Sequence, residues 1–171
     1  DLEGKELGRN RKVDVAVDGD TGLVLEQLLA AYGATKDPAW LAEIRAAETK
    51  SRAKMVPEIE SNETPVNPLR LCAEISKRLG KEDVVVGDGG DFVATAANVL
   101  KMQHPQIWMD PGPLGTLGVG PGYAMAAACT RPNAVTWLVY GDGSFGLHGL
   151  EFEALARQKL PVLAVIGNDA G

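Results

Sequence analysis

Polar and apolar positions divide the chain into a helical first part and a second part in which strands and helices alternate. Residues 12–18 alternate between the two kinds of side chain, which predicts a strand. An Asp-Thr pair at 20–21 provides caps for a helix that runs to about Ala31, with Gly33 as its stop. An Asp-Pro pair opens a charged helix over residues 37–55, and we expect its charged side chains to face solvent.

The pattern changes after a polar stretch with three prolines, residues 57–68, which we interpret as a linker and a domain boundary. Beyond it we predict helices over 67–79, 92–102 and 150–158, and strands over 83–86, 134–140 and 161–167. The last two strands are apolar almost throughout. Such strands, alternating with helices, are typical of an α/β fold in which helices cover both faces of a parallel sheet.

Polar or glycine-rich turns follow the three predicted strands directly, at residues 87–91, 141–146 and 167–171. In open parallel sheets, ligands bind at the carboxyl ends of the strands. We therefore expect these three turns to converge on one edge of the sheet and to form a ligand site.

Composition narrows the function classes. The 171 residues carry a net charge of −6 and no long basic run, which argues against nucleic-acid binding. No apolar run reaches transmembrane length, and the first residues do not form a signal peptide, so we expect a cytoplasmic protein. Cys72 and Cys129 are expected to be buried free thiols in a reducing compartment, and the scattered cysteines and histidines do not suit a zinc site.

The segment Gly141–Gly146 reads G-x-G-x-x-G, a pattern of dinucleotide-binding turns, and Asp169 lies where a ribose-binding acid could sit. One interpretation is therefore an NAD- or FAD-linked oxidoreductase that binds its cofactor without metal. Asp142, however, would face the pyrophosphate. Two like charges about 4 Å apart repel by roughly 4 kcal/mol at an effective dielectric constant near 20.

A divalent cation would reverse that repulsion. Mg²⁺ takes about six oxygen ligands and commonly joins carboxylates to phosphates. Asp142 supplies a carboxylate oxygen, Asn168 supplies an amide oxygen at the end of the next strand, and a backbone carbonyl beyond Asn168 could supply a third. Gly143 and Ser144 then offer backbone N–H groups to phosphate at a helix N-terminus.

Gly-Asp-Gly at 141–143, followed by 24 residues and Asn168, resembles the diphosphate-binding motif of thiamine-diphosphate enzymes. The resemblance covers roughly residues 66–171. It implies that Asp142, Asn168 and the backbone carbonyl of Ala170 hold Mg²⁺, and that Gly141, Gly143 and Ser144 help to bind the cofactor.

The stretch DPGPLGTLGVGPGYAMAAA, residues 110–128, adds to this resemblance. In the family, an apolar residue in such a turn wedges between the two rings of the cofactor, and Leu117 matches it. The carbonyl of Gly115 matches the acceptor for the aminopyrimidine amino group. Gly90 and Asp91 match the loop at the outer phosphate, although an acid at 91 departs from the usual polar residue and could instead cap the following helix.

Within the family, the quoted motifs are most similar to the 2-hydroxyacyl-CoA lyase group, which includes acetolactate-synthase-like proteins. This implies a carbon–carbon lyase or carboligase that converts a 2-hydroxyacyl-CoA to an aldehyde and formyl-CoA, or runs the reverse condensation. The alternative is an acetolactate synthase or another 2-keto acid decarboxylase, although Asn-Asp at 168–169 departs from the Asn-Asn of many acetolactate synthases. A non-catalytic homologue is a third interpretation.

The resemblance also implies a domain organisation. Residues 1–33 are the tail of a middle domain, 34–66 are a charged helix and linker, and 67–171 are a thiamine-diphosphate- and Mg²⁺-binding domain truncated at its C-terminal side. We expect a fragment that is inactive alone, because family members take their activating glutamate from a separate pyrimidine-binding domain, usually across a homodimer or homotetramer interface. No catalytic residue is identified in this chain, and His148 is expected to face solvent or start a helix.

Overall fold

The computed structural model describes residues 2–33 and 38–169. The chain divides into two compact units, Asp1–Ser51 and Arg52–Gly171. Across both described ranges, no helix is long and apolar enough to cross a membrane.

The first unit contains the 3-10 turn η1 (Gly4–Glu6), helix α1 (Thr21–Tyr32) and the first part of α2 (Pro38–Ile59). The caps of α1 confirm the prediction, since Asp20 Oδ1 accepts a hydrogen bond from Leu23 N at 3.0 Å and Gly33 ends the helix with φ of 71°. The strand predicted at residues 12–18 is wrong. These residues form no ladder, and alternation alone cannot hold a strand without a hydrogen-bonded neighbour.

Helix α2 continues through Pro57 to Ile59, so it ends four residues later than predicted and takes up the start of the predicted linker. A proline in the last turn removes only one helical hydrogen bond. Met55 and Ile59 pack against the core of the second unit, which explains why this turn stays helical.

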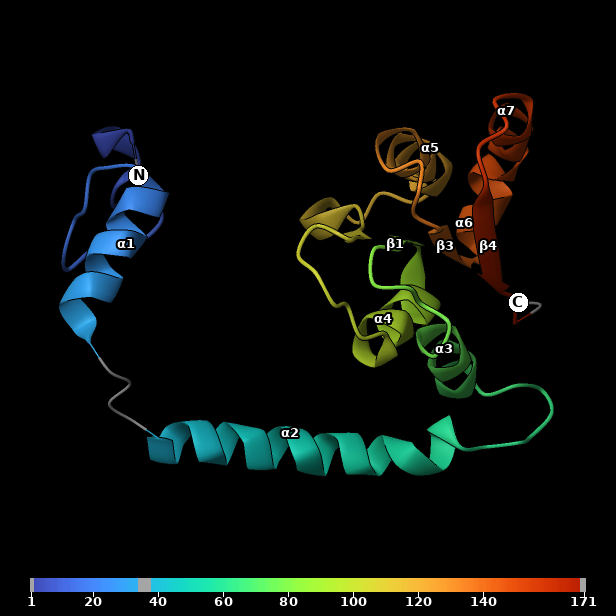
Figure 1. Ribbon diagram of the computed structural model, residues 1–171, viewed down its shortest axis with the longest axis horizontal. Coiled ribbons are helices and arrows are strands. Elements are labelled where there is room, and N and C mark those ends of the chain that lie inside the picture. The colour runs from blue at the N-terminus through green and yellow to red at the C-terminus, as the bar shows by residue number, and fades with distance from the viewer. Residues whose placement is uncertain (1, 34–37, 170–171) are drawn as a thin grey trace. The chain divides into compact units, whose positions relative to one another are not determined.

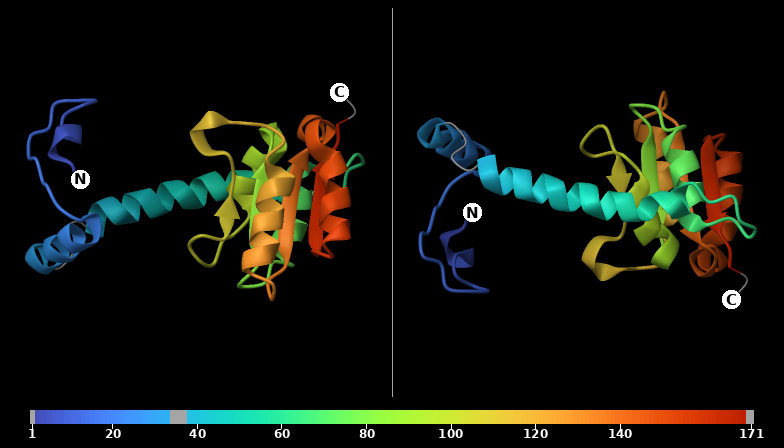
Figure 2. Two further views of the ribbon diagram at one scale, coloured as in Figure 1. Left: turned by 90° about the horizontal axis from the view of Figure 1, so that it is seen from above. Right: turned by 90° about the horizontal axis from the view of Figure 1, so that it is seen from below.

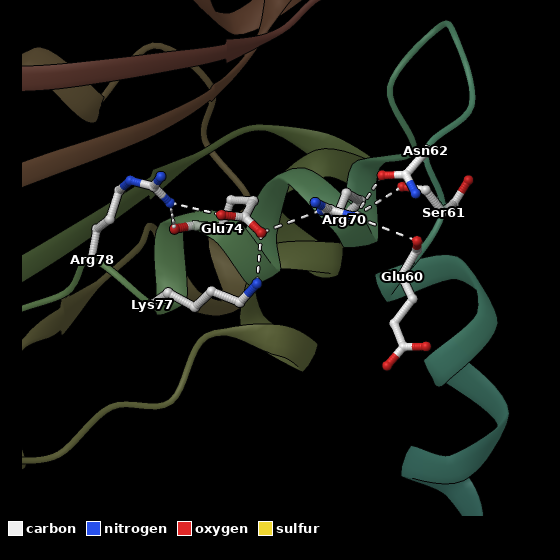
Figure 3. Close-up of polar contacts among 7 residues, drawn as sticks. All are labelled: Glu60, Ser61, Asn62, Arg70, Glu74, Lys77 and Arg78. Carbon is white, nitrogen blue, oxygen red and sulfur yellow. Dashed lines mark hydrogen bonds and ion pairs between the residues drawn. The ribbon is translucent and has the colours of Figure 1, made fainter.

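Arg70 fastens the remaining linker to helix α3 (Pro68–Ser76). Its guanidinium donates to the carbonyl oxygen of Ser61 at 3.2 Å and to Asn62 Oδ1 at 3.1 Å (Figure 3). Glu74, one turn along α3, accepts from Lys77 at 2.6 Å and from Arg78 at 2.8 Å. Hydrogen bonds from Lys77 and Arg78 lower the pKa of Glu74 from 4.5 to about 2.

The second unit is built on a four-stranded parallel sheet with the order β2-β1-β3-β4, which confirms the predicted α/β fold. Figure 2 shows β4 at one edge of this sheet. The strands are β1 (Val84–Asp88), β2 (Trp108–Met109), β3 (Thr136–Gly141) and β4 (Val162–Gly167). The short β2 lies in a stretch for which no strand was predicted.

Helices cover both faces of β1 and β3, with α3 and α4 (Gly90–Val99) on one side and α5 (Gly120–Thr130) on the other (Figure 1). Alternate strand residues supply the two cores: Val85 and Val139 point toward α3 and α4, whereas Val86 and Leu138 point toward α5. All four side chains are fully buried.

Helix α5 was not predicted, and of helix α6 (Asp142–His148) only a helix N-terminus at Gly143 and Ser144 was predicted, because glycine-rich sequence hides the helical pattern in both. The predicted helix 150–158 appears as the turn η3 (Gly149–Glu151) and helix α7 (Phe152–Arg157). Both cysteines are free, and Cys72 is buried as expected. Cys129 is exposed, which corrects the prediction, because it falls on the outer side of the last turn of α5.

Candidate functional site

The carboxyl ends of β1, β3 and β4 lie side by side, so the turns that follow them meet at one edge of the sheet. Asp88 of β1 is in register with Tyr140 of β3, and Gly141 of β3 is in register with Gly167 of β4. The α-carbon of Gly141 faces the turn after β1, where an added Cβ would lie 3.7 Å from the carbonyl oxygen of Gly89. The structure thus brings the first two predicted turns together and directs β4 to the same edge.

The two predicted side-chain metal ligands follow neighbouring strand ends. Asp142 is the first residue of α6, and its Oδ1 accepts a hydrogen bond from Gly143 N at 2.7 Å. Asn168 comes directly after β4 and is exposed. Ala170, the predicted carbonyl ligand, lies outside the described residues. The site therefore presents one carboxylate and one amide, a donor set that suits a hard cation such as Mg²⁺.

No group of three or more His, Cys, Asp or Glu that could hold a metal occurs within the described ranges 2–33 and 38–169. The predicted donor set is of another kind, because it combines one carboxylate with amide and backbone oxygens.

A hollow of about 340 Å³ opens beside this edge, between the start of α4 and the segment that follows β2. Three predicted cofactor residues line it: Gly90, Gly115 and Leu117. Gly115 has φ of 60°, which favours glycine, and leaves open space beside its α-carbon. Asp91 lies within the first turn of α4 and is exposed, and the N-cap of this helix is Gly89, so the prediction that Asp91 caps the helix is wrong and its role at the outer phosphate stays a prediction.

The sequence reasoning missed Asp88, the last residue of β1. Its side chain is fully buried, and it accepts hydrogen bonds from Gly118 N at 2.9 Å, from Gly120 N at 2.6 Å and from the Ser144 hydroxyl. The signal available in the sequence was an acid at the very end of an otherwise apolar strand. A carboxylate at such a position is buried only when hydrogen-bond donors surround it, which marks it as a point where other segments meet.

Ser144 is 2% exposed and its hydroxyl is engaged by Asp88 and by Gly118 N, which donates to it at 3.0 Å. The prediction for Ser144 is that its backbone N–H donates to the diphosphate. The hydrogen bonds of its hydroxyl do not conflict with that prediction.

Aromatic rings pack beneath the start of α6. The ring of Tyr140 meets that of Phe145 edge-on, with centroids 5.8 Å apart, and also contacts Phe152. Burial, and then the negative charge of Asp88, raise the pKa of the Tyr140 phenol. This hydroxyl therefore stays neutral and does not add charge to the site.

His148 ends α6 and is exposed, as expected. Its ring lies directly against the α-carbon of Gly118, where an added Cβ would come within 2.1 Å of His148 Nδ1. The loop that carries Leu117 therefore touches both ends of α6, through Ser144 at the start and His148 at the finish.

Residues 88–171 match the family described as thiamine pyrophosphate enzyme, C-terminal TPP binding domain. The chain is similar to human 2-hydroxyacyl-CoA lyase 2, with 41% identity over 165 residues, which are 94% of this chain and 26% of the relative. It is also similar to a probable acetolactate synthase of Mycobacterium bovis, with 38% identity over 159 residues, or 93% of this chain and 29% of the relative. The chain thus spans about a quarter of the length of these relatives.

Proposed function

We propose that this chain, which belongs to the thiamine pyrophosphate enzymes through the C-terminal TPP-binding domain at residues 88–171, serves a thiamine-diphosphate-dependent carbon–carbon lyase or carboligase. The observation that carries the proposal is that Asp142 and Asn168 follow the neighbouring ends of β3 and β4, at the sheet edge beside which a hollow lined by Gly115 and Leu117 opens. A dinucleotide site would account for the glycines but not for this pair.

The residues would divide the work as follows. Asp142 and Asn168, with the carbonyl of Ala170, would hold Mg²⁺, whose charge offsets the repulsion between Asp142 and the diphosphate. The N–H groups of Gly143 and Ser144 would donate to the diphosphate. Leu117 and the Gly115 carbonyl would orient the two rings, with Gly90 and Asp91 near the outer phosphate. Bound thiamine diphosphate would supply an electron sink for breaking a bond beside a carbonyl.

For the substrate, we propose a 2-hydroxyacyl-CoA cleaved to an aldehyde and formyl-CoA, or the reverse condensation. Support comes from the relatives named 2-hydroxyacyl-CoA lyase 2 in human and in Danio rerio, the latter 39% identical over 161 residues. The relatives named acetolactate synthase favour the second candidate, a 2-keto acid carboligase. An assay of the whole protein decides: formyl-CoA release from 2-hydroxyacyl-CoA supports the first, and pyruvate consumption supports the second.

The cofactor is tested by thermal unfolding of the whole protein with thiamine diphosphate and Mg²⁺, with thiamine diphosphate and EDTA, and with NAD. A ligand at 100 times its Kd adds about 2.7 kcal/mol of stability. We expect stabilisation by thiamine diphosphate that requires Mg²⁺ and is lost in Asp142→Ala. The matched control is Asp169→Asn, which removes the acid on which a dinucleotide site would depend. Stabilisation by NAD without metal, lost in Asp169→Asn and kept in Asp142→Ala, would reject the proposal.

We also propose that residues 1–33 belong to a middle domain, 34–66 to a linker and 67–171 to the cofactor domain. Helix α1 is apolar on most sides and leaves Leu25, Leu28 and Leu29 more than half exposed, as expected for a helix that a larger domain buries.

A second chain would complete the site. Apolar side chains are exposed on the segments around it, with Leu114 at 88%, Leu117 at 45% and Leu147 at 58% exposure. Surfaces of this kind mark interfaces. We expect a homodimer or homotetramer by light scattering of the whole protein, and no turnover by residues 1–171 alone. A fully active monomer of the whole protein would contradict the first expectation, and turnover by residues 1–171 alone would contradict the second.

A further inference from the structure

We infer that Asp88 is a positioning residue, which fixes the loop carrying Leu117 to the turn that begins α6. This deepens the proposed function and rests on it for the identity of the cofactor. Three segments far apart in sequence meet at this one carboxylate. They are the end of β1, residues 118–120, where the Leu117 loop leads into α5, and the first turn of α6 at Ser144.

The carboxylate is bound on both oxygens. Oδ1 accepts from Gly118 N at 2.9 Å and from the Ser144 hydroxyl, while Oδ2 accepts from Gly120 N at 2.6 Å. Gly120 is the first residue of α5, whose own N-cap residue, Val119, has no side-chain acceptor. Asp88, at the end of β1, therefore supplies the negative charge that the N-terminus of α5 favours.

Close packing leaves this junction little freedom. A Cβ at Gly120 would come within 2.8 Å of Asp88 Oδ2, and a Cβ at Gly89 would come within 2.8 Å of the Ser144 Cβ. Gly118 has φ of 87°, a conformation that other residues rarely adopt. The neighbouring backbone thus approaches the carboxylate closely, and three protein groups donate hydrogen bonds to it.

Leu117 lies immediately before Gly118 and lines the hollow, and a Cβ at Gly89 would lie 3.5 Å from Leu117 Cδ2. The hydrogen bonds of Asp88 therefore fix how far Leu117 reaches over the hollow relative to Gly143 and Ser144. In the proposed function, Leu117 contacts the rings of the cofactor, and Gly143 and Ser144 bind the diphosphate of the same molecule. The distance from Leu117 to these two residues must then be set before the cofactor binds, and Asp88 sets it.

The test compares Asp88→Asn with Asp83→Asn in the whole protein. Both substitutions keep the size of the side chain but replace one acceptor oxygen by a donor. Asp83 is the matched control, since it also accepts three hydrogen bonds, from Gly80 N at 2.9 Å, Val135 N at 3.2 Å and Trp137 Nε1 at 3.0 Å, but just before β1 begins, away from the site.

Two readouts are taken: hydrogen exchange at Gly118 and Gly120 without cofactor, by mass spectrometry with residue-level fragmentation, and the Kd of thiamine diphosphate with Mg²⁺ by calorimetry. We expect Asp88→Asn to speed exchange at both amides at least tenfold and to raise the Kd at least tenfold. We expect Asp83→Asn to lower the melting temperature without either change. Equal effects of the two variants, or unchanged exchange in Asp88→Asn, would overturn the inference.

Ser144→Ala keeps the test decisive if Asp88→Asn does not fold. It removes one partner of Gly118 N and leaves the bond from Gly120 to Asp88, so we expect faster exchange at Gly118 alone. Uniform exchange across the loop would contradict the inference. If the unsubstituted protein binds no thiamine diphosphate, the proposed function fails, and the exchange data alone then decide whether Asp88 fixes the loop.

Discussion

The two thiols differ in burial and therefore in reactivity. Cys72 is fully buried, and burial raises its pKa from 9.0 to about 11, so very little reactive thiolate forms near neutral pH. Cys129 is exposed. We expect a thiol reagent to label Cys129 at once and Cys72 only after denaturant is added, with peptide mass spectrometry identifying the site. Rapid labelling of Cys72 in the native protein would show that α3 opens readily.

Two glycines illustrate how strongly tertiary packing decides the effect of one methyl group. A Cβ at Gly87, within β1, would lie 2.6 Å from Val93 Cγ1, whereas a Cβ at Gly122, within α5, would meet nothing within 4 Å. We expect Gly87→Ala to lower the free energy of unfolding by about 1–3 kcal/mol through overpacking. Gly122→Ala should raise it by about 0.5–1 kcal/mol, because it removes helix-destabilising flexibility. Urea unfolding measures both, and the same sign for both would contradict this account.

Helix α3 is stabilised by Glu74 through cations placed three and four residues away, and this predicts a pH dependence of stability. Its pKa is about 2 in the folded protein against an ordinary 4.5. A lowered folded-state pKa means that the contribution is complete above about pH 4.5 and is lost as the pH falls toward 2. We expect Glu74→Gln to destabilise the protein at pH 7 in low salt, and this difference to shrink between pH 4.5 and 2 and in high salt.

The control for this experiment is Glu153→Gln in α7. Among residues 2–33 and 38–169, Glu153 pairs only with Arg157, at 3.1 Å, and the pair is largely exposed. An exposed pair of this kind contributes less than about 1 kcal/mol. If Glu153→Gln lowers the stability as much as Glu74→Gln does, then Lys77 and Arg78 together stabilise the folded protein through Glu74 no more than a single exposed partner would.

Across the whole molecule, the two units differ in whether they form a buried core. No described side chain of Asp1–Ser51 is buried, whereas the second unit has two buried clusters, and Met55 and Ile59 pack against one of them. Segments without buried contacts open most easily. We expect brief trypsin treatment of the 171-residue chain to cut first within residues 1–54 and to leave a resistant product that begins near Met55. A first cut between 88 and 169 would contradict this.

Features that depend on near neighbours along the chain were predictable from the amino-acid sequence alone. Strand and helix periods predicted the parallel sheet, because strands buried on both faces must be apolar throughout. The caps of α1 followed from Asp20 and Gly33, whose effects act over one turn. The convergence of the turns after β1 and β3 also followed, since parallel strands end at the same edge. Asp142 and Asn168 were identifiable for that reason, and their metal role stays a prediction.

Features that depend on residues distant in sequence could be seen only in the folded protein. The tertiary structure left residues 12–18 without a strand partner and placed Cys129 on the outer side of a helix. It also buried Asp88 among N–H groups that lie 30 and 32 positions away. The physical reason is the same throughout. A hydrogen bond or a buried surface needs two sides, and a local pattern specifies only one of them.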